Sequence, residues 1–410
     1  MYNVYDIRKH FPMLNEGRTM QGKPLVFLDN CSTSFKPQSV IDSITNYYSS
    51  TTSNSHRGDY DLCYNMDVLI DETRDTIAKF VNANKNEVVF TTGTTGSINL
   101  VAWGYGFKNL KKGDEILLTE AEHASNILPW YNIARLTGAV VKFVPLDEKG
   151  RLTVENLEKT ISKNTKIVSF AHIGNVLGYI CDIKSIAKVA HQYGAVVVVD
   201  GAQSVPHIKT DFKDLDIDFL CFSAHKMCGP TGIGALIGKY DLLQDMDPLF
   251  MGGGMNVKFN MCGEVEVLNA PVKFESGTLN LAGIVGFKAA VEFINSIGIE
   301  NIHKHESELK KYAISKLENN DKIIIYNKDA DVGIITFNIK DVFAQDEATL
   351  LNSKGIAVRS GQHCAKVLND YLKTPATCRA SFYLYTTKEE VDVFIDALIN
   401  GGDFLDAFFS

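Results

Sequence analysis

The stretch Ala195-Val196-Val197-Val198-Val199-Asp200-Gly201-Ala202-Gln203 decides the fold class. Its first five residues are apolar and mostly β-branched, which is typical of a strand that is buried on both faces of a parallel sheet. Asp200 ends this strand, and open α/β sheets place their ligand sites at the carboxyl ends of strands. The stretch therefore predicts an α/β domain with a functional carboxylate at one edge of its sheet.

Similar apolar runs flank this stretch and alternate with helical patterns. Strands are expected at 87–91, 115–119, 140–144, 166–171 and 219–222, and helices at 37–48, 61–80 and 182–193. This alternation predicts a large domain around a mostly parallel sheet. After residue 280, we expect helices at 281–297 and 302–318, strands at 322–326 and 332–339, and a closing helix at 388–400. These elements predict a smaller α+β domain.

Composition and charge exclude several classes of function. The 410 residues carry a net charge of −8 and no basic stripe, which argues against a nucleic-acid surface. No apolar run is long enough for a membrane span, and residues 1–20 lack the apolar core of a secretory signal. The eight cysteines form no C-x-x-C pair, so we expect no metal site. We therefore expect a cytoplasmic protein.

Two further segments suggest a cofactor site beside Asp200. Lys226 lies in a loop that follows an apolar strand, and a lysine desolvated there is suited to form a Schiff base. The stretch 91–97 (TTGTTGS) lies between a strand and a helix, where free backbone N–H groups bind phosphate. A carboxylate such as Asp200 can hold a pyridinium nitrogen protonated. Together these residues favour a pyridoxal 5'-phosphate (PLP) site.

The motifs around these residues resemble those of class V cysteine desulfurases of the SufS and CsdA type, nearly end to end. They are Leu28-Asp29-Asn30, Asn54-Ser55-His56-Arg57-Gly58, Thr94-Thr95 with Ile98-Asn99, Glu122-His123 with Asn126-Ile127-Leu128-Pro129-Trp130, Asn175-Val176-Leu177-Gly178, Asp200-Gly201-Ala202-Gln203, Ser223-Ala224-His225-Lys226, Phe274-Glu275-Ser276-Gly277-Thr278 and Arg359-Ser360-Gly361-Gln362-His363-Cys364-Ala365.

The resemblance implies an aspartate aminotransferase-like fold, the fold type I of PLP-dependent transferases. It implies an N-terminal segment at 1–25 that packs with the small domain, a PLP-binding large domain at 26–280 and a small C-terminal domain at 281–410. In the cofactor site, Lys226 would bind PLP covalently and later move the α-proton of the substrate. Asp200 would hold the pyridine nitrogen, Gln203 would bond the phenolic oxygen, and His123 would stack on the ring and assist proton transfer.

The resemblance also implies how the cofactor phosphate is bound. Thr95, Ser223 and His225 would hold it from the same chain. Thr278 would reach the phosphate from a neighbouring subunit, so the resemblance implies a homodimer.

Substrate and sulfur would meet at the other end of the site. By resemblance, Asn175 and Arg379 would bind the substrate carboxylate, and Arg359 would line the pocket near the nucleophile. Cys364 lies in a glycine-bearing loop, which suits a thiolate that must reach the substrate sulfur. Arg359 and His363 are candidate partners that favour the thiolate.

The implied reaction converts L-cysteine to L-alanine and leaves the sulfur on Cys364 as a persulfide. A sulfur-acceptor protein of the SufE or SufU kind would then carry it toward iron–sulfur cluster assembly. Selenocysteine lyase activity uses the same fold and cofactor and stays open, as does a class V aminotransferase-like reaction. A non-catalytic sulfur-relay protein is a further alternative, disfavoured by the complete set of cofactor residues.

The chain departs from the family pattern at several positions around the site. They are Cys31, Gly96, Ala124, Lys273 and Gln362. None of them replaces an implied catalytic group. We expect them to affect turnover and the response to a partner.

Overall fold

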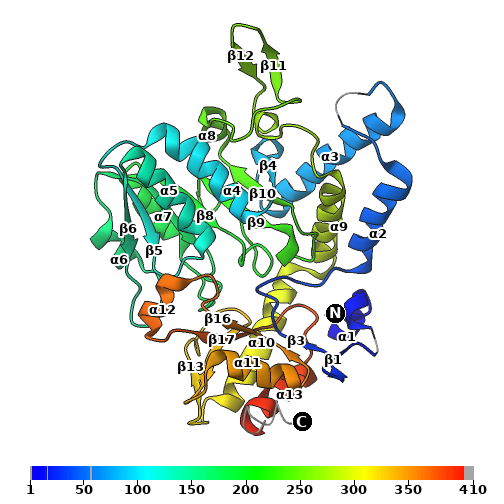
Figure 1. The fold of residues 1–410 in the computed structure, drawn as a ribbon, viewed down its shortest axis with the longest axis vertical. Helices are drawn as coiled ribbons and strands as arrows, with labels where there is room; N and C mark the ends of the chain where they lie inside the picture. The colour runs from blue at the N-terminus through cyan, green and yellow to red at the C-terminus, as the bar shows by residue number, and fades with distance from the viewer. Residues whose placement is uncertain (1, 16, 56–57, 401–410) are drawn as a thin grey trace.

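The computed structural model describes residues 2–15, 17–55 and 58–400, which build two larger sheets, three two-stranded sheets and the helices around them (Figure 1). The larger sheet has seven strands in the order β4-β10-β9-β8-β7-β5-β6. Their bounds are β4 Val88–Thr91, β10 Gly234–Gly238, β9 Phe219–Ser223, β8 Val196–Asp200, β7 Thr165–Ala171, β5 Glu115–Thr119 and β6 Val140–Val144. All are parallel except β10, which runs antiparallel to both β9 and β4. The predicted α/β architecture is confirmed.

Strand β8 shows why this sheet needs cover on both sides. Its five residues are buried, and successive side chains point to opposite faces. Val197 and Val199 join the apolar cluster on one face, whereas Val196 and Val198 join the cluster on the other. A sheet of such strands is stable only between two layers of helices.

Helices supply both layers. One layer contributes apolar residues to the cluster of Val197 and comprises α3 Asp61–Phe80, α6 Val154–Thr160, α7 Ile183–Gln192 and α9 Leu281–Ile297. The opposite layer comprises α4 Thr94–Val101, α5 Leu128–Thr137 and α8 Tyr240–Asp245. Helix α2, Gln38–Asn46, packs on α9.

The second sheet has four antiparallel strands in the order β13-β14-β17-β16. They are β13 Ile323–Ile325, β14 Ile334–Ile339, β17 Thr377–Ser381 and β16 Arg359–Gly361. The helices that follow α9 are α10 Ile299–Leu317, α11 Ala344–Ser353, α12 Lys366–Leu372 and α13 Lys388–Asn400. Leu309 of α10, Phe337 of β14 and Phe394 of α13 share one apolar cluster. This part of the chain therefore has a core of its own.

The beginning of the chain packs on this second core. Short strand β3, Val26–Phe27, pairs in parallel with β15, Ile356–Ala357. Helix α1, Val4–Arg8, carries Arg8, which forms an ion pair of 2.9 Å with Glu390 of α13. Two short strands, β1 Thr19–Met20 and β2 Lys23–Pro24, form a hairpin that lies between α1 and β3 in the sequence. The domain boundaries at 25/26 and 280/281 stay predictions.

Most expected elements lie within a few residues of their predicted bounds, whereas several observed elements were not expected, among them α11, α12 and β17. Strand β10 was not expected, and its sequence GALIG is short and begins and ends with glycine. Hairpin β11–β12, Asn256–Phe259 and Val265–Val267, projects from the top of the molecule in Figure 1. The segment 359–361, expected as part of a loop, is edge strand β16.

Among the described residues no single helix has the length and apolar composition to cross a membrane. Only α9 and α10 taken together pass that test, as a pair bent by 71°. The inward face of α9 belongs to the core below the large sheet.

Candidate active site

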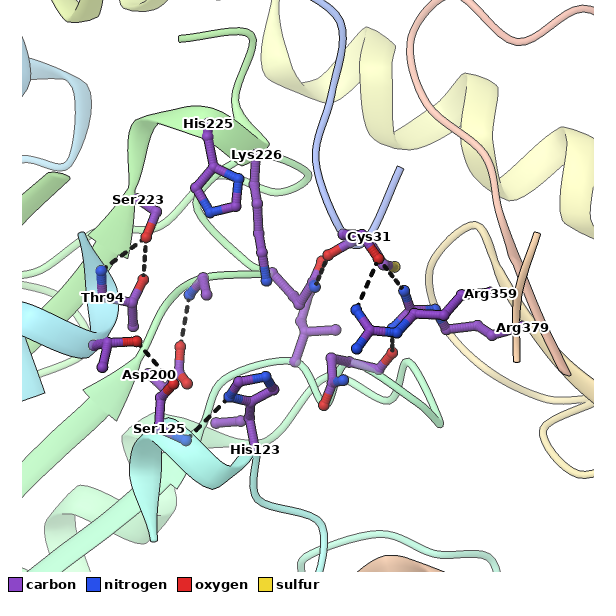
Figure 2. A pocket seen from close by; sticks show the side chains of 17 residues that line it. Cys31, Thr94, His123, Ser125, Asp200, Ser223, His225, Lys226, Arg359 and Arg379 are labelled. Carbon is purple, nitrogen blue, oxygen red and sulfur yellow. Dashed lines mark hydrogen bonds between the residues drawn. The ribbon is translucent and has the colours of Figure 1, made fainter. Parts of the chain in front are cut away.

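A cavity of about 180 Å³ lies where the carboxyl ends of β7, β8 and β9 approach β16 and β17 (Figure 2). Every residue that the sequence assigned to the site lines this cavity, except Cys364 and Thr278. These lining residues are Thr95, His123, Asn175, Asp200, Gln203, Ser223, His225, Lys226, Arg359 and Arg379. The structure thus brings together residues that are up to 284 positions apart in the chain.

Lys226 and Asp200 form the reactive centre of the cavity. Lys226 ends a short 3-10 turn, Ala224–Lys226, directly after β9, and its side chain points into the cavity (Figure 2). Burial lowers the pKa of Lys226, against the opposing effect of the Asp200 carboxylate. Burial raises the pKa of Asp200, whose Oδ1 accepts a hydrogen bond of 2.9 Å from the Ala202 N–H. A lysine with a lowered pKa is a nucleophilic amine at lower pH than an ordinary lysine.

The turn that carries Lys226 is clamped by the segment that follows β3. The carbonyl of His225 accepts hydrogen bonds from Ser34 N at 3.0 Å and from Thr33 Oγ1, Ser34 Oγ and Lys36 Nζ, each at 3.1 Å. Ser34 Oγ also accepts from Cys228 N at 2.8 Å. The backbone on both sides of Lys226 is therefore fixed.

The start of helix α4 forms an anion site beside this turn. Ser223 Oγ accepts from Thr94 N at 2.7 Å and lies 2.8 Å from Thr94 Oγ1. Gly93 precedes the helix with φ +129°, a conformation that favours glycine, and a Cβ there would lie 3.0 Å from Ser223 Oγ. Free N–H groups and hydroxyls at a helix N-terminus suit a phosphate.

Thr95 and His225 flank this anion site. The hydroxyls of Thr95 and Ser125 lie 2.8 Å apart, which holds Thr95 at the cavity wall. Burial, followed by the charges of Lys226 and Lys36, lowers the pKa of His225 to about 4. The His225 ring is therefore neutral at physiological pH, with one N–H to donate.

His123 is held at the cavity wall by a buried network beneath it. Its Nδ1 accepts from Ser125 N at 3.1 Å, which leaves the proton of the neutral ring on Nε2. Burial, then the positive charges of Lys226 and the two arginines, lowers the pKa of His123 to about 4. The preceding Glu122 accepts from Asn126 Nδ2 at 2.7 Å and from Ala171 N at 3.2 Å. Burial raises the pKa of Glu122 to about 7.

Two amide side chains of the cavity keep a buried oxygen without a partner. Gln203 donates through Nε2 to Cys31 O at 2.9 Å, and its Oε1 has no hydrogen-bond partner. Asn175 donates through Nδ2 to His363 O at 2.9 Å, and its Oδ1 also has none. Buried polar atoms left unpaired in a cavity indicate that a polar ligand completes them. Together with Lys226, Asp200 and the anion site, the cavity fits PLP.

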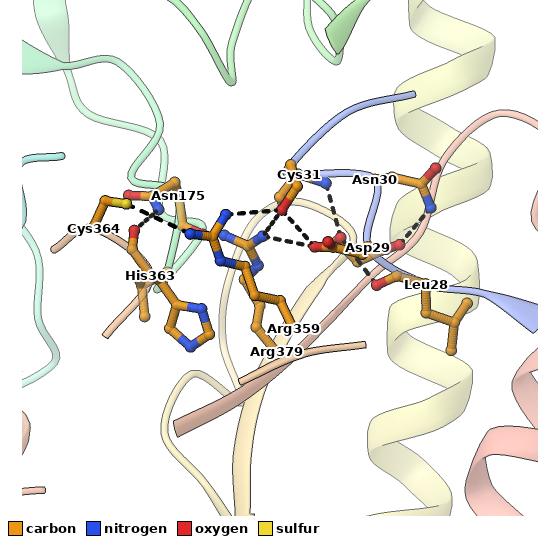
Figure 3. Close-up of polar contacts among 12 residues, drawn as sticks. Leu28, Asp29, Asn30, Cys31, Asn175, Arg359, His363, Cys364 and Arg379 are labelled. Carbon is orange, nitrogen blue, oxygen red and sulfur yellow. Dashed lines mark hydrogen bonds and ion pairs between the residues drawn. The ribbon is translucent and has the colours of Figure 1, made fainter. Parts of the chain in front are cut away.

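The two arginines lie on the opposite wall. Arg379 is 1% exposed; its Nη1 donates to Asn175 O at 2.8 Å, and its Nη2 lies 3.0 Å from Asp29 Oδ1. The Arg359 Nη2 reaches the Cys364 Sγ at 3.5 Å (Figure 3). The wall can bind a substrate carboxylate and reach toward the thiol at the same time.

Cys364 lies outside the cavity and is exposed. Its carbonyl accepts from Ala124 N at 2.7 Å, and φ is +56° at Cys364 and +51° at His363. The ring of His363 turns away from the thiol: its Nε2 lies 3.0 Å from Thr377 O, and burial lowers its pKa to about 3. Arg359 therefore contacts the thiol, and His363 does not.

Two other cysteines lie close in sequence to assigned site residues, Cys228 to Lys226 and Cys378 to Arg379, and both are buried. Burial raises the pKa of Cys228 to about 12, and it also raises the pKa of Cys378. Cys378 Sγ donates to Ala344 O at 3.0 Å inside the small core. Neither lines the cavity, so both serve as buried structural residues.

Thr278 does not reach the cavity of its own chain. It lines a separate groove of about 560 Å³, together with Gly96 and Phe250. This position leaves it free to act on another subunit, and that role stays a prediction. His56 and Arg57 lie outside the described residues.

Four polar residues of the cavity wall had no individual role assigned from the sequence. They are Cys31, Ser32, Thr94 and Ser125. Thr94 and Ser125 lie within two positions of an assigned residue. Cys31 and Ser32 directly follow the motif at 28–30, and only the fold shows that this segment crosses the site.

A family model described as aminotransferase class-V matches residues 26–394. The chain is 46% identical over 397 residues to a protein of Halalkalibacterium halodurans named "Probable cysteine desulfurase", covering 97% of each chain. Its structure is similar to that of the cysteine desulfurase CsdA from Escherichia coli, with 35% identity, a TM-score of 0.91 and 98% of each chain covered. An apo cysteine desulfurase from Thermococcus onnurineus gives 34% identity and a TM-score of 0.91, with 97% of this chain and 98% of that one covered.

The chain therefore belongs to the class-V aminotransferase family. Enzymes of this family depend on PLP. The residues around Lys226 match that requirement, as the unpaired amide oxygens and the helix N-terminus indicate.

Proposed function

We propose that the protein is a PLP-dependent cysteine desulfurase, which converts L-cysteine to L-alanine and takes the sulfur onto Cys364 as a persulfide. One observation carries the proposal: Arg359 lines the cavity of Lys226 and Arg379 and also contacts the exposed thiol of Cys364. An arginine of the cavity wall thus contacts a thiol just outside it, which can accept sulfur from an amino acid bound in the cavity. The names of the similar proteins support the same activity.

Each residue of the cavity has a role that follows from its position. Arg379 and Asn175 bind the substrate carboxylate, which fixes the α-carbon beside Lys226. The neutral amine of Lys226 removes and returns the α-proton. Asp200 would hold the pyridine nitrogen of PLP in its protonated form, the second Nε2–H of Gln203 would bond the phenolic oxygen, and PLP would supply the electron sink that weakens the C–S bond.

Cys364 completes the reaction. Its thiolate attacks the substrate sulfur, so an S–S bond forms while the C–S bond breaks. The electron pair of the C–S bond stays with the carbon skeleton, which leaves as L-alanine after protonation. The Arg359 Nη2 contact with Sγ, at 3.5 Å, orients the thiol toward the cavity.

The test is to incubate the purified protein with L-cysteine and to measure alanine and sulfide in the presence of a thiol reductant. The wild type should produce both, and Lys226→Ala and Cys364→Ala should produce neither. Full alanine output from Cys364→Ala would contradict the acceptor role. With L-selenocysteine, a Cys364→Ala variant that still forms alanine would favour the lyase activity, since selenium can leave without attack by the thiol.

We also infer a homodimer in which Thr278 completes the phosphate site of the neighbouring subunit. The support is the groove that Thr278 lines and the projecting hairpin β11–β12, whose Val257, Phe259 and Met261 are exposed. A monomer rarely exposes such an apolar cluster. Light scattering should give twice the mass of the chain, and Thr278→Ala should lower PLP affinity. A monomeric mass would overturn this inference.

The partner we propose is a small sulfur-acceptor protein of the SufE or SufU kind, which would feed iron–sulfur cluster assembly in the cytoplasm. A groove of about 630 Å³, lined by Phe343 and by Gly361 and Gln362 of the segment that leads to Cys364, offers room for its loop. An added acceptor should raise the rate of alanine formation and become labelled with sulfur. Unchanged turnover with acceptors of both kinds would contradict the proposal.

A further inference from the structure

The hydroxyl of Ser32 lies between the two arginines of the cavity wall. Its Oγ accepts from Arg359 Nη1 at 3.1 Å and from Arg379 Nη2 at 3.0 Å. The same hydroxyl donates to Asp29 Oδ1 at 2.7 Å. A hydroxyl has one proton and two lone pairs, so these three contacts use its full capacity. Its orientation is therefore determined.

This arrangement reduces the repulsion between two positive charges in the small sheet. Arg359 and Arg379 are directly opposite each other across β16 and β17, and like charges in that position repel. Figure 3 shows the two side chains next to each other, with Asp29 on one side and Cys364 on the other. Asp29 pairs with Arg379 alone, and among the described residues Arg359 has no carboxylate partner. The oxygen that the two guanidinium groups share is that of Ser32.

A continuous chain of contacts therefore joins the carboxylate site to the sulfur acceptor. It runs from Arg379 through the Ser32 hydroxyl to Arg359, and from Arg359 Nη2 to Cys364 Sγ at 3.5 Å. A carboxylate that binds Arg379 can take its unpaired Nε–H and so turn the guanidinium group relative to Asp29 and Ser32. Any shift of the Ser32 hydroxyl then changes how firmly Arg359 is held at the thiol.

We propose that Ser32 is a positioning residue that couples occupancy of the carboxylate site at Arg379 to the reactivity of Cys364. The proposal rests on the proposed function only in its assignment of Arg379 to the substrate carboxylate. In the free enzyme, Ser32 holds Arg359 in the orientation that reaches the thiol. When the amino acid binds, the same hydroxyl transmits the change to Arg359.

The experiment measures the rate at which iodoacetamide alkylates Cys364 in the holoenzyme, by mass spectrometry of its peptide. L-Alanine serves as the probe, because it carries the carboxylate and amine and has no sulfur to transfer. In the wild type, saturating L-alanine should change the alkylation rate about fivefold, a common size for coupling between two sites. In Ser32→Ala the rate should be lower without L-alanine and should not respond to it.

Two further variants separate coupling from damage to the fold. Ser32→Thr keeps the hydroxyl and should restore most of the response. Ser296→Ala removes an exposed hydroxyl of α9, whose Oγ donates to Phe293 O, and should behave as the wild type. If Ser32→Ala unfolds, Asp29→Asn tests the same chain of contacts, since it weakens the anchor of the hydroxyl, and its response should fall.

A Ser32→Ala enzyme with the wild-type response, or a wild type without any response, would overturn the coupling. The readout does not depend on sulfur transfer. Loss of alanine and sulfide production from cysteine in the wild type would therefore contradict the proposed function and leave the alkylation result interpretable.

Discussion

Asp200 ends a strand that is otherwise made of valine, and its side chain is 5% exposed. A buried carboxylate is costly unless a positive group pairs with it. The protonated nitrogen of a pyridine ring is such a group. The position of this one residue therefore explains both its raised pKa and its fit to the cofactor.

Replacing Asp200 with Asn tests that explanation. The amide keeps the size of the side chain and cannot hold the ring nitrogen protonated, so kcat for alanine formation should fall on the order of 100-fold. Asp182→Asn is the matched control, since Asp182 caps α7 through Ser185 N and asparagine caps as well as aspartate. An Asp200→Asn enzyme with wild-type kcat would contradict the role.

A second residue-level prediction concerns stability. Arg74 forms a buried bidentate pair with Glu275, with N–O distances of 2.8 and 2.7 Å, and Glu275 also accepts from Phe90 N. Arg74→Met leaves the Glu275 carboxylate buried without its cation, so the free energy of unfolding should fall by about 3–5 kcal/mol. Urea denaturation measures this loss. Lys79→Met removes an exposed pair with Asp75 and should change stability by less than about 0.5 kcal/mol.

At the level of elements, helix α11 packs on β14, β16 and β17 through a buried carboxyl group. Glu347 accepts from Ile339 N at 3.1 Å, and its Oε1 is buried without a partner. Burial raises the pKa of Glu347 from its model-compound value of 4.5 to about 8. The folded protein therefore holds this group neutral at pH values where the unfolded chain ionises it.

The direction of the pH effect follows from that difference. The folded state binds one proton more than the unfolded state between about pH 4.5 and pH 8, so stability falls as the pH rises through this window. Glu347→Gln stays neutral and should lose less stability over the same range, by a margin on the order of 2–4 kcal/mol. Denaturation curves at pH 5 and pH 8.5 measure the margin. Equal pH dependence of the wild type and Glu347→Gln would contradict it, and Glu308→Gln, on an exposed face of α10, serves as the control.

The sequence predicted elements better than contacts between elements. The apolar run at 195–200 and the lysine after the next strand were sufficient to place Asp200 and Lys226 at one sheet edge. The clamp on the His225 carbonyl was not predictable, because its donors lie about 190 positions earlier in the chain. Ser32 was missed for the same reason: its arginine partners lie 327 and 347 positions away.

At the scale of the whole molecule, the N-terminal segment joins the two cores. Phe11 is fully buried and packs edge-on against Phe293 of α9 and Tyr385 near α13, with ring centroids 5.5 and 4.8 Å away. Phe11→Ala should lower the free energy of unfolding by about 3–5 kcal/mol, since it opens a cavity in the apolar cluster below the large sheet. Met13→Ala, at a position 41% exposed, should cost much less. Equal losses in thermal denaturation would contradict this packing role of Phe11.

The overall architecture was predictable because the helices and strands of each layer repeat apolar residues at a regular spacing in the sequence. The 20-residue helix α3 and the closing helix α13 have the predicted bounds. Strand β10 and the hairpin β11–β12 left no such trace, since their pairing depends on neighbours that lie elsewhere in the chain. The sequence patterns predicted which residues are buried. They did not predict which strands pair with each other.

The exposure of Cys364 outside the cavity limits how many sulfur atoms each chain can hold between turnovers. Under the proposed activity each chain can store one sulfur atom at its surface before the next turnover requires removal of that atom. Without reductant or acceptor, the first burst of alanine should therefore equal one molecule per chain. Delivery then depends on collision with another molecule and not on the concentration of free sulfide, so the protein acts as a single-atom reservoir that the acceptor empties.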